Sequence, residues 1–172
     1  MSDTTVLVAG IGNTFLGDDG FGVEVARRLL QQNPPEGVRV VDFGIASFDL
    51  AFALLEAASL TILVDACQRG GPPGALYTID PGPENLERME QRSVDGNRLN
   101  LVQVLRMAKA MGAHFGRILL VGCEPAMFER EEEGLTELSP AVAAAVDRAI
   151  EIIRLRIIAA GISWPPVRGI GS

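Results

Sequence analysis

The sequence has few aromatic residues and few cysteines, and each shortage excludes a class of protein. Aromatic residues make up 5% of the 172 residues, so valine, isoleucine, leucine and alanine must fill most of the core. The two cysteines are too few for a disulfide scaffold, and they do not form a CxxC pair. This composition suits a sheet covered by helices.

Long apolar runs and an excess of basic residues are also missing. Charged residues interrupt every long apolar stretch before it reaches membrane-spanning length, and the polar N-terminus lacks the basic region of a signal peptide. The formal net charge of −7 opposes binding to nucleic acid and to anionic membranes. We therefore expect a cytoplasmic protein that binds neither, and we expect a monomer. A protein partner with a basic segment would suit this charge.

Short apolar runs alternate with amphipathic segments along the chain. We expect strands at 5–9, 37–43, 61–64, 75–79 and 117–121, and helices at 21–33, 47–58, 99–111 and 139–160. This order predicts an α/β fold, a three-layer α/β/α sandwich with a mostly parallel five-stranded sheet. Prolines around 75–79 favour an edge strand there, which could run antiparallel. Residues 1–163 should form a single domain, and 164–172 a flexible tail.

Acidic residues collect where the predicted strands end. Ligands of open α/β sheets bind beyond the carboxyl ends of the strands. Carboxylates from separate loops can converge there on one cation, and Asp19 and Asp65 are the natural pair. Each acid alone also has a structural explanation, because Asp18 or Asp19 could cap the next helix and Asp65 could stabilise a turn. Their combination favours a metal site, since clustered like charges persist mainly where a cation or a function needs them. The acids at these strand ends are Asp18, Asp19, Asp42, Asp65 and Glu124.

The glycine-rich loop at residues 10–20 allows a nucleotide-binding hypothesis as well. Gly10 and Gly12 match the first two glycines of the GxGxxG fingerprint, but Phe15 occupies the third position. The GK(S/T) sequence of a P-loop is absent. Asp18 and Asp19 would also place negative charge near a bound phosphate, so this hypothesis is the weaker one.

A longer motif includes the same loop. Residues 10–22 read GIGNTFLGDDGFG, which resembles the signature GxGNxxxxD(D/E)xxG of [NiFe]-hydrogenase maturation endopeptidases. The resemblance implies a phosphorylase/hydrolase-like fold. It also implies a peptidase that removes the C-terminal extension of a hydrogenase large subunit after nickel insertion, with the substrate nickel as recognition element. The likeness continues through residues 42–44, 64–66, 99–105, 121–125 and 134–140.

In that family an acid of the first loop, an aspartate ending the third strand and a histidine before the central helix bind metal. The resemblance assigns the first two roles, and catalysis, to Asp19 and Asp65. Asn97 stands at the histidine position. Asn97 could bind the metal through its amide oxygen, Asp95 could replace it, or the chain could be a weakened or non-catalytic checkpoint member. The substrate-binding candidates are Gly12, Asn13, Asp42, Gly44 and Asp95.

The metal that the resemblance implies is nickel, delivered within the substrate rather than held as a cofactor. Zinc or cadmium could replace it in crystals. The metal could polarise the scissile carbonyl while Asp19 or Asp65 activates a water molecule. The only histidine, His114, should lie away from the strand carboxyl ends in a structural or exposed position. We expect Cys67 and Cys123 to act as small buried side chains rather than as ligands.

Overall fold

The computed structural model describes residues 3–80, 101–126 and 137–165. Within these ranges the chain alternates strands and helices as the apolar pattern predicts. The strands are β1 (Val6–Ile11), β2 (Val38–Gly44), β3 (Leu60–Ala66), β4 (Leu76–Ile79) and β5 (Arg117–Cys123). The helices are the 3-10 helix η1 (Thr14–Gly20) and the α-helices α1 (Phe21–Leu30), α2 (Ser47–Leu54), α4 (Leu101–Ala110) and α5 (Pro140–Ala159).

The five strands form one sheet in the order β2-β1-β3-β5-β4. Strand β1 pairs in parallel with β2 and β3, and β3 pairs in parallel with β5. Strand β4 lies at the edge and runs antiparallel to β5, which confirms the expected mostly parallel sheet with an antiparallel edge strand. Because the other four strands are parallel, their carboxyl ends lie at one edge of the sheet.

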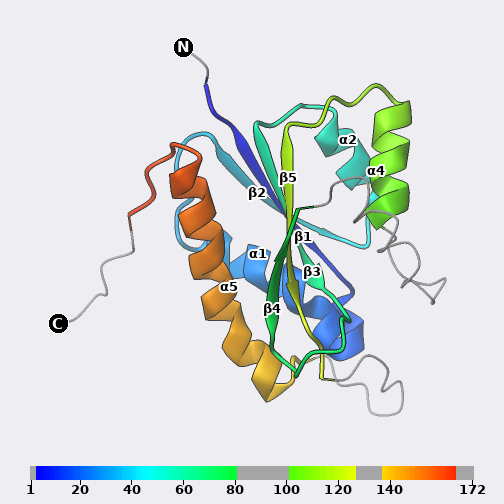
Figure 1. The fold of residues 1–172 in the computed structure, drawn as a ribbon, viewed down its shortest axis with the longest axis vertical. Coiled ribbons are helices and arrows are strands. Elements are labelled where there is room, and N and C mark those ends of the chain that lie inside the picture. Colours follow the sequence, from blue (N-terminus) through cyan, green and yellow to red (C-terminus); the bar gives the residue numbers. More distant parts are fainter. Residues whose placement is uncertain (1–2, 81–100, 127–136, 166–172) are drawn as a thin grey trace.

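Helices cover both faces of the sheet and create two separate cores (Figure 1). Residues of β1 alternate between the cores, with Val6 and Val8 facing α1 and α5 while Leu7 and Ala9 face α2 and α4. This arrangement explains why the strand reads as a continuous apolar run, since both of its faces are buried. Among the described residues, no helix combines the length and the hydropathy needed to span a bilayer.

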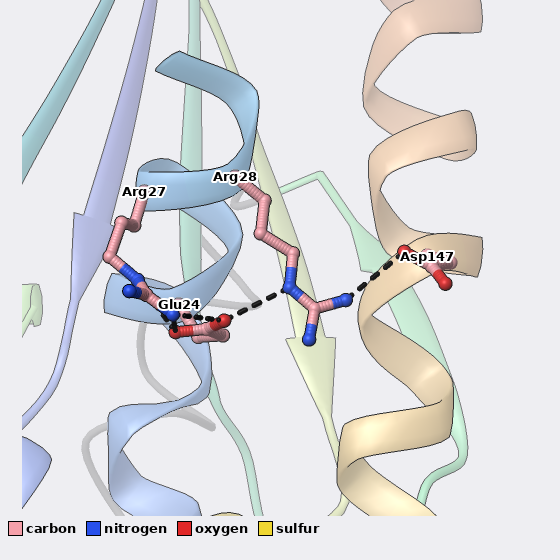
Figure 2. A network of polar contacts seen from close by, with 4 residues as sticks. All are labelled: Glu24, Arg27, Arg28 and Asp147. Carbon is pink, nitrogen blue, oxygen red and sulfur yellow. Dashed lines mark hydrogen bonds and ion pairs between the residues drawn. The ribbon is translucent and has the colours of Figure 1, made fainter. Parts of the chain in front are cut away.

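One ion pair joins the two helices on one face, next to further pairs within α1 (Figure 2). Glu24 of α1 accepts hydrogen bonds from Arg27 and Arg28 of the same helix. The Arg28 guanidinium also reaches Asp147 of α5, with 3.2 Å between Nη1 and Oδ1. Because these side chains are partly or largely exposed, each pair contributes little to stability.

Several element ends differ from the expectation. Helix α1 ends at Leu30, and Asn33 already has a left-handed φ of 52°. Helix α2 begins with Ser47 as a helical residue rather than as its cap, and it ends at Leu54 instead of reaching residue 58. The loop at residues 14–20 is a 3-10 helix. The apolar pattern did not predict it, because this short glycine-rich segment has no helical apolar period.

Trp164 is packed in the core, so the expectation that a flexible tail begins at residue 164 is wrong. Its side chain is 3% exposed and packs into the core between the sheet and α1 and α5. Its carbonyl accepts a hydrogen bond from Arg154 at 2.8 Å, and its indole N–H donates to the Gln32 carbonyl at 3.4 Å. Packed structure therefore includes Trp164, while residues 166–172 lie outside the described residues.

Candidate functional site

The loop after β1 lies directly on the ends of the neighbouring strands, and its glycines make this possible. The Gly12 N–H donates to the Gly44 carbonyl at the end of β2, at 3.0 Å. A Cβ built on Gly12 would overlap the Asp19 carbonyl oxygen, and one built on Gly22 would overlap the Val64 carbonyl of β3. Glycine at these two positions therefore lets η1 and the start of α1 pack against the carboxyl edge of the sheet.

Asp19 and Asp65 lie at this edge on neighbouring segments. Gly10 of β1 is paired with Val64 of β3, and Asp65 is the next residue of β3, so it lies beside the end of β1, where the loop that carries Asp19 begins. Asp19 is 8% exposed and Asp65 is half-buried. Both acids therefore lie at the carboxyl edge of the sheet, and a shared site formed by their carboxylates stays a prediction.

Backbone groups orient both carboxylates. Asp19 Oδ2 accepts the Asn13 N–H at 3.0 Å, and Asp65 Oδ1 accepts the Ala66 N–H at 2.8 Å. A carboxylate has two oxygens and about four lone-pair positions, so it can accept such a bond and still bind a cation or a proton. The pair can therefore supply oxygen ligands or a general base.

These two acids do not form a complete metal site by themselves. In the part of the chain that the structure describes, no group of three or more histidine, cysteine, aspartate or glutamate residues is arranged to hold a metal ion. The predicted third ligand, Asn97, and its alternative, Asp95, lie outside the described residues. A metal at this edge needs ligands beyond the two aspartates.

Asp18, adjacent to Asp19, holds two segments together. Its side chain is 2% exposed and accepts the Ala126 N–H at 2.9 Å, the Ser139 N–H at 2.6 Å and the Ser139 hydroxyl at 2.8 Å. The residue thus ties η1 to the end of β5 and to the start of α5. The hypothesis that Asp18 or Asp19 caps α1 is wrong, since the cap is Gly20 without a side-chain hydrogen bond.

Ser139 also differs from the sequence expectation. It precedes Pro140 at the first position of α5, as predicted, and its backbone is extended. Its hydroxyl makes no capping bond to the helix and donates to Asp18 instead. The serine therefore anchors the η1 turn rather than the helix that it begins.

The end of β2 contributes a turn next to Gly12. The exposed Asp42 accepts the Gly44 N–H at 2.9 Å, and Gly44 has a φ of 55° that favours glycine. Asp42 therefore stabilises the turn that presents the Gly44 carbonyl to Gly12. Of the predicted substrate-binding residues, the structure thus gathers Gly12, Asn13, Asp42 and Gly44 at one end of β1 and β2.

Glu124 has a structural function that sequence reasoning did not assign. It is 5% exposed and accepts the Arg69 N–H at 2.7 Å, the Gly70 N–H at 2.9 Å and the Tyr77 hydroxyl at 3.3 Å. This buried carboxylate fixes the β3–β4 connection. Its position at a strand end was the only sequence signal, and it resembled that of Asp65.

Of the remaining titratable candidates, His114 and Cys123 lie as expected, and Cys67 is more exposed than expected. His114 is exposed, away from the carboxyl edge. Cys123 is fully buried, and burial, with a smaller contribution from the Asp18 charge, raises the pKa of its thiol to about 12. Cys67 is half-buried, and its backbone N–H donates to the Cys123 carbonyl at 2.8 Å.

Comparison with known proteins gives one consistent result. A family model described as hydrogenase maturation protease matches residues 23–155. The hydrogenase expression/formation protein HupD of Rhodobacter capsulatus is 36% identical over 148 residues, which cover 84% of this chain and 67% of that protein. The hydrogenase maturating endopeptidase HybD from Escherichia coli has a TM-score of 0.82 at 25% identity, covering 95% of this chain and 98% of its own. A hydrogenase 2 maturation peptidase from a Thaumarchaeota archaeon has a TM-score of 0.67 at 31% identity, covering 91% and 99%.

Proposed function

Because this chain belongs to the hydrogenase maturation protease family, it is a peptidase, and we propose that it removes the C-terminal extension of a [NiFe]-hydrogenase large subunit after nickel insertion. The observation that carries the proposal is the pair Asp19 and Asp65 at one edge of the sheet. Each carboxylate is at least half-buried and fixed by a backbone N–H. Nickel bound in the substrate is the recognition element, so it is part of the substrate and not a resident cofactor.

In the proposed reaction, Asp19 and Asp65 bring carboxylate oxygens to the nickel of the docked substrate. One of them accepts a proton from water, whose oxygen attacks the scissile carbonyl carbon. The C–N bond then breaks, and the proton passes to the leaving amine. Nickel can assist by polarising the carbonyl. The backbone bonds to the two aspartates keep the carboxylates oriented before the substrate arrives.

The loop glycines and the neighbouring polar groups position the substrate chain in this proposal. Gly12 and Gly44 hold the site loop close to the end of β2, since the Gly12 N–H donates to the Gly44 carbonyl and a side chain at Gly12 would overlap the Asp19 carbonyl. Asn13 and Asp42 offer polar groups beside it. Asn97 supplies the third metal contact through its amide oxygen, with Asp95 as the alternative. A member that binds the nickel-loaded subunit without cutting it is the second candidate, and the histidine-to-asparagine difference at Asn97 is the observation that favours it.

A processing assay tests the proposal. Purified large-subunit precursor, loaded with nickel or free of it, is incubated with the protein, and the loss of the extension is followed by mass spectrometry. We expect cutting of the nickel-loaded form only, and a decrease of about 100-fold or more in Asp19→Asn and Asp65→Asn, the scale of general-base catalysis. Asp147→Asn, which alters an exposed acid on α5, is the matched control.

Two results would contradict the proposal. Equal cutting of the nickel-free precursor would show that nickel is not needed for recognition. Unimpaired cutting by both aspartate variants would show that Asp19 and Asp65 are not needed for catalysis. Binding of the nickel-loaded precursor by the wild-type protein without any cutting would favour the checkpoint candidate.

A further inference from the structure

Exposed large apolar side chains occur on α2 and on the turn that precedes it. Ile45, Phe48 and Phe52 are 63%, 67% and 57% exposed. We name these three residues the apolar ridge. Single exposed apolar residues are common, but a contiguous group of large ones marks an interaction surface.

The helix itself explains why the ridge faces outward. Phe48 and Phe52 are four residues apart, so they share one face of α2. The other face is buried against the sheet and α4 by Leu50, Ala51 and Leu54. The ridge therefore adds nothing to the core, and exposing it to water has a cost that binding would recover.

The apolar ridge borders the proposed catalytic edge. Ile45 directly follows Gly44, whose carbonyl accepts the Gly12 N–H of the site loop. Leu63 of β3 faces the α2–α4 core, and alternate strand residues face the same side, so Asp65 lies on the sheet face that α2 covers. Asp65 and the ridge therefore lie on the same side of the sheet.

A hollow beside the ridge indicates the chemistry of the ligand. It measures about 390 Å³ and is lined by apolar groups of β2 and α2 together with Asp42 and Asp49. Its one cation, Arg39, is engaged by Glu56 at 2.9 Å. The lining therefore has a negative charge beside an apolar surface, which suits apolar side chains next to a lysine or arginine.

We propose that the apolar ridge and this hollow dock the protein substrate itself, through a segment that combines apolar side chains with a basic residue. The identity of the partner rests on the proposed function, and the docking surface rests on the exposed residues and charge described above. A second copy of this chain is a poorer occupant, because the formal net charge of −7 makes two copies repel each other.

The test compares two double variants of the full-length protein. Phe48→Ser with Phe52→Ser removes the ridge, and Leu155→Ser with Ile158→Ser removes exposed apolar groups of α5, which covers the other sheet face (Figure 1). Calorimetry measures binding of the purified large-subunit precursor, and the processing assay separates KM from kcat. All four side chains are exposed, so circular dichroism should show both variants folded.

We expect the ridge variant to weaken precursor binding about tenfold or more and to raise KM with little change in kcat, as loss of aromatic anchors does. The α5 variant should stay within about twofold of wild type. Asp49→Lys should also weaken binding, and high salt should diminish the difference between Asp49→Lys and wild type.

Equal binding by the ridge variant and the α5 variant would overturn the inference, as would a loss of self-association without a loss of precursor binding. Failure of the proposed function can be distinguished from failure of the docking inference, because calorimetry measures binding independently of cutting. A wild-type protein that binds the precursor through the ridge but never cuts it would contradict catalysis and leave the docking surface supported.

Discussion

Replacing Asp18 with asparagine should destabilise the protein strongly, although the two side chains have nearly the same size. From the described residues the Asp18 carboxylate accepts at least three hydrogen bonds, two on Oδ2 from the Ala126 N–H and the Ser139 hydroxyl and one on Oδ1 from the Ser139 N–H. An asparagine has only one acceptor oxygen. If that oxygen takes the Oδ2 position, the amide NH₂ faces the Ser139 N–H, and two donors confront each other.

The magnitude follows from these bonds. A buried N–H left without an acceptor costs about 1–3 kcal/mol, and a hydrogen bond to a neutral acceptor is roughly 1 kcal/mol weaker than one to a charged acceptor. Removing a buried charge offsets part of this loss. We therefore expect Asp18→Asn to lower the free energy of unfolding by about 2–4 kcal/mol, which corresponds to a fall in Tm of roughly 4–16 °C for a chain of this size.

Urea and thermal denaturation measure the effect, with Asp42→Asn as the control. Asp42 is exposed, and its one described bond, to the Gly44 N–H, can be kept by an amide oxygen, so this variant should change stability by less than about 0.5 kcal/mol. In a double-mutant cycle, Asp18→Asn and Ser139→Ala should be non-additive by about 0.5 kcal/mol or more. Additive effects, or an Asp18→Asn variant as stable as Asp42→Asn, would refute the anchoring role.

Three further variants or reagents probe the fold. Gly22→Ala should destabilise by about 1–3 kcal/mol in urea unfolding despite the helix preference of alanine, because the new Cβ would overlap backbone oxygens of Ile11 and Val64; a more stable variant would contradict the close packing. The pKa of Glu24 is lowered from 4.5, mainly by the hydrogen bond from Arg27, while desolvation opposes the shift. The ionised Glu24 side chain therefore stabilises the fold above pH 4.5, and this stabilisation is lost as the pH falls through the lowered pKa. Glu24→Gln should thus lower the free energy of unfolding by about 0.5 kcal/mol at pH 7 and by almost nothing near pH 2. The same difference between wild type and variant at both pH values would exclude the ion pairs as its cause. Cys123, with its pKa raised to about 12, should resist iodoacetamide at pH 8 in the folded protein and react in urea, as peptide mass spectrometry can show; equal rates would mean that the thiol is not buried.

The strand and helix order could be predicted because each buried strand is apolar on both faces. Val6 through Ala9 alternate between two cores, and this gives the continuous run that identifies a central parallel strand. The short strand at Leu76–Ile79 was also recognised as an edge from its flanking prolines. These are local patterns, and tertiary contacts did not override them.

The roles of individual acids were harder to predict, because strand-end acids look alike in sequence. Asp18, Asp65 and Glu124 all follow or approach strand ends. Asp18 and Glu124 accept several hydrogen bonds from distant segments, which no local pattern reveals. The burial of Trp164 was missed for the same reason, since its partners Gln32 and Arg154 are set by the packing of α1 against α5.

The most direct test of the central claim is a crystal structure of this protein bound to nickel-loaded large-subunit precursor, with diffraction recorded at the nickel absorption edge. The Asp65→Asn variant would be used only if the wild-type complex is cut during crystallisation. We predict one nickel peak with carboxylate oxygens of Asp19 and Asp65 both within about 2–2.5 Å, the range of metal–carboxylate bonds. A nickel peak that neither side chain reaches would contradict the account.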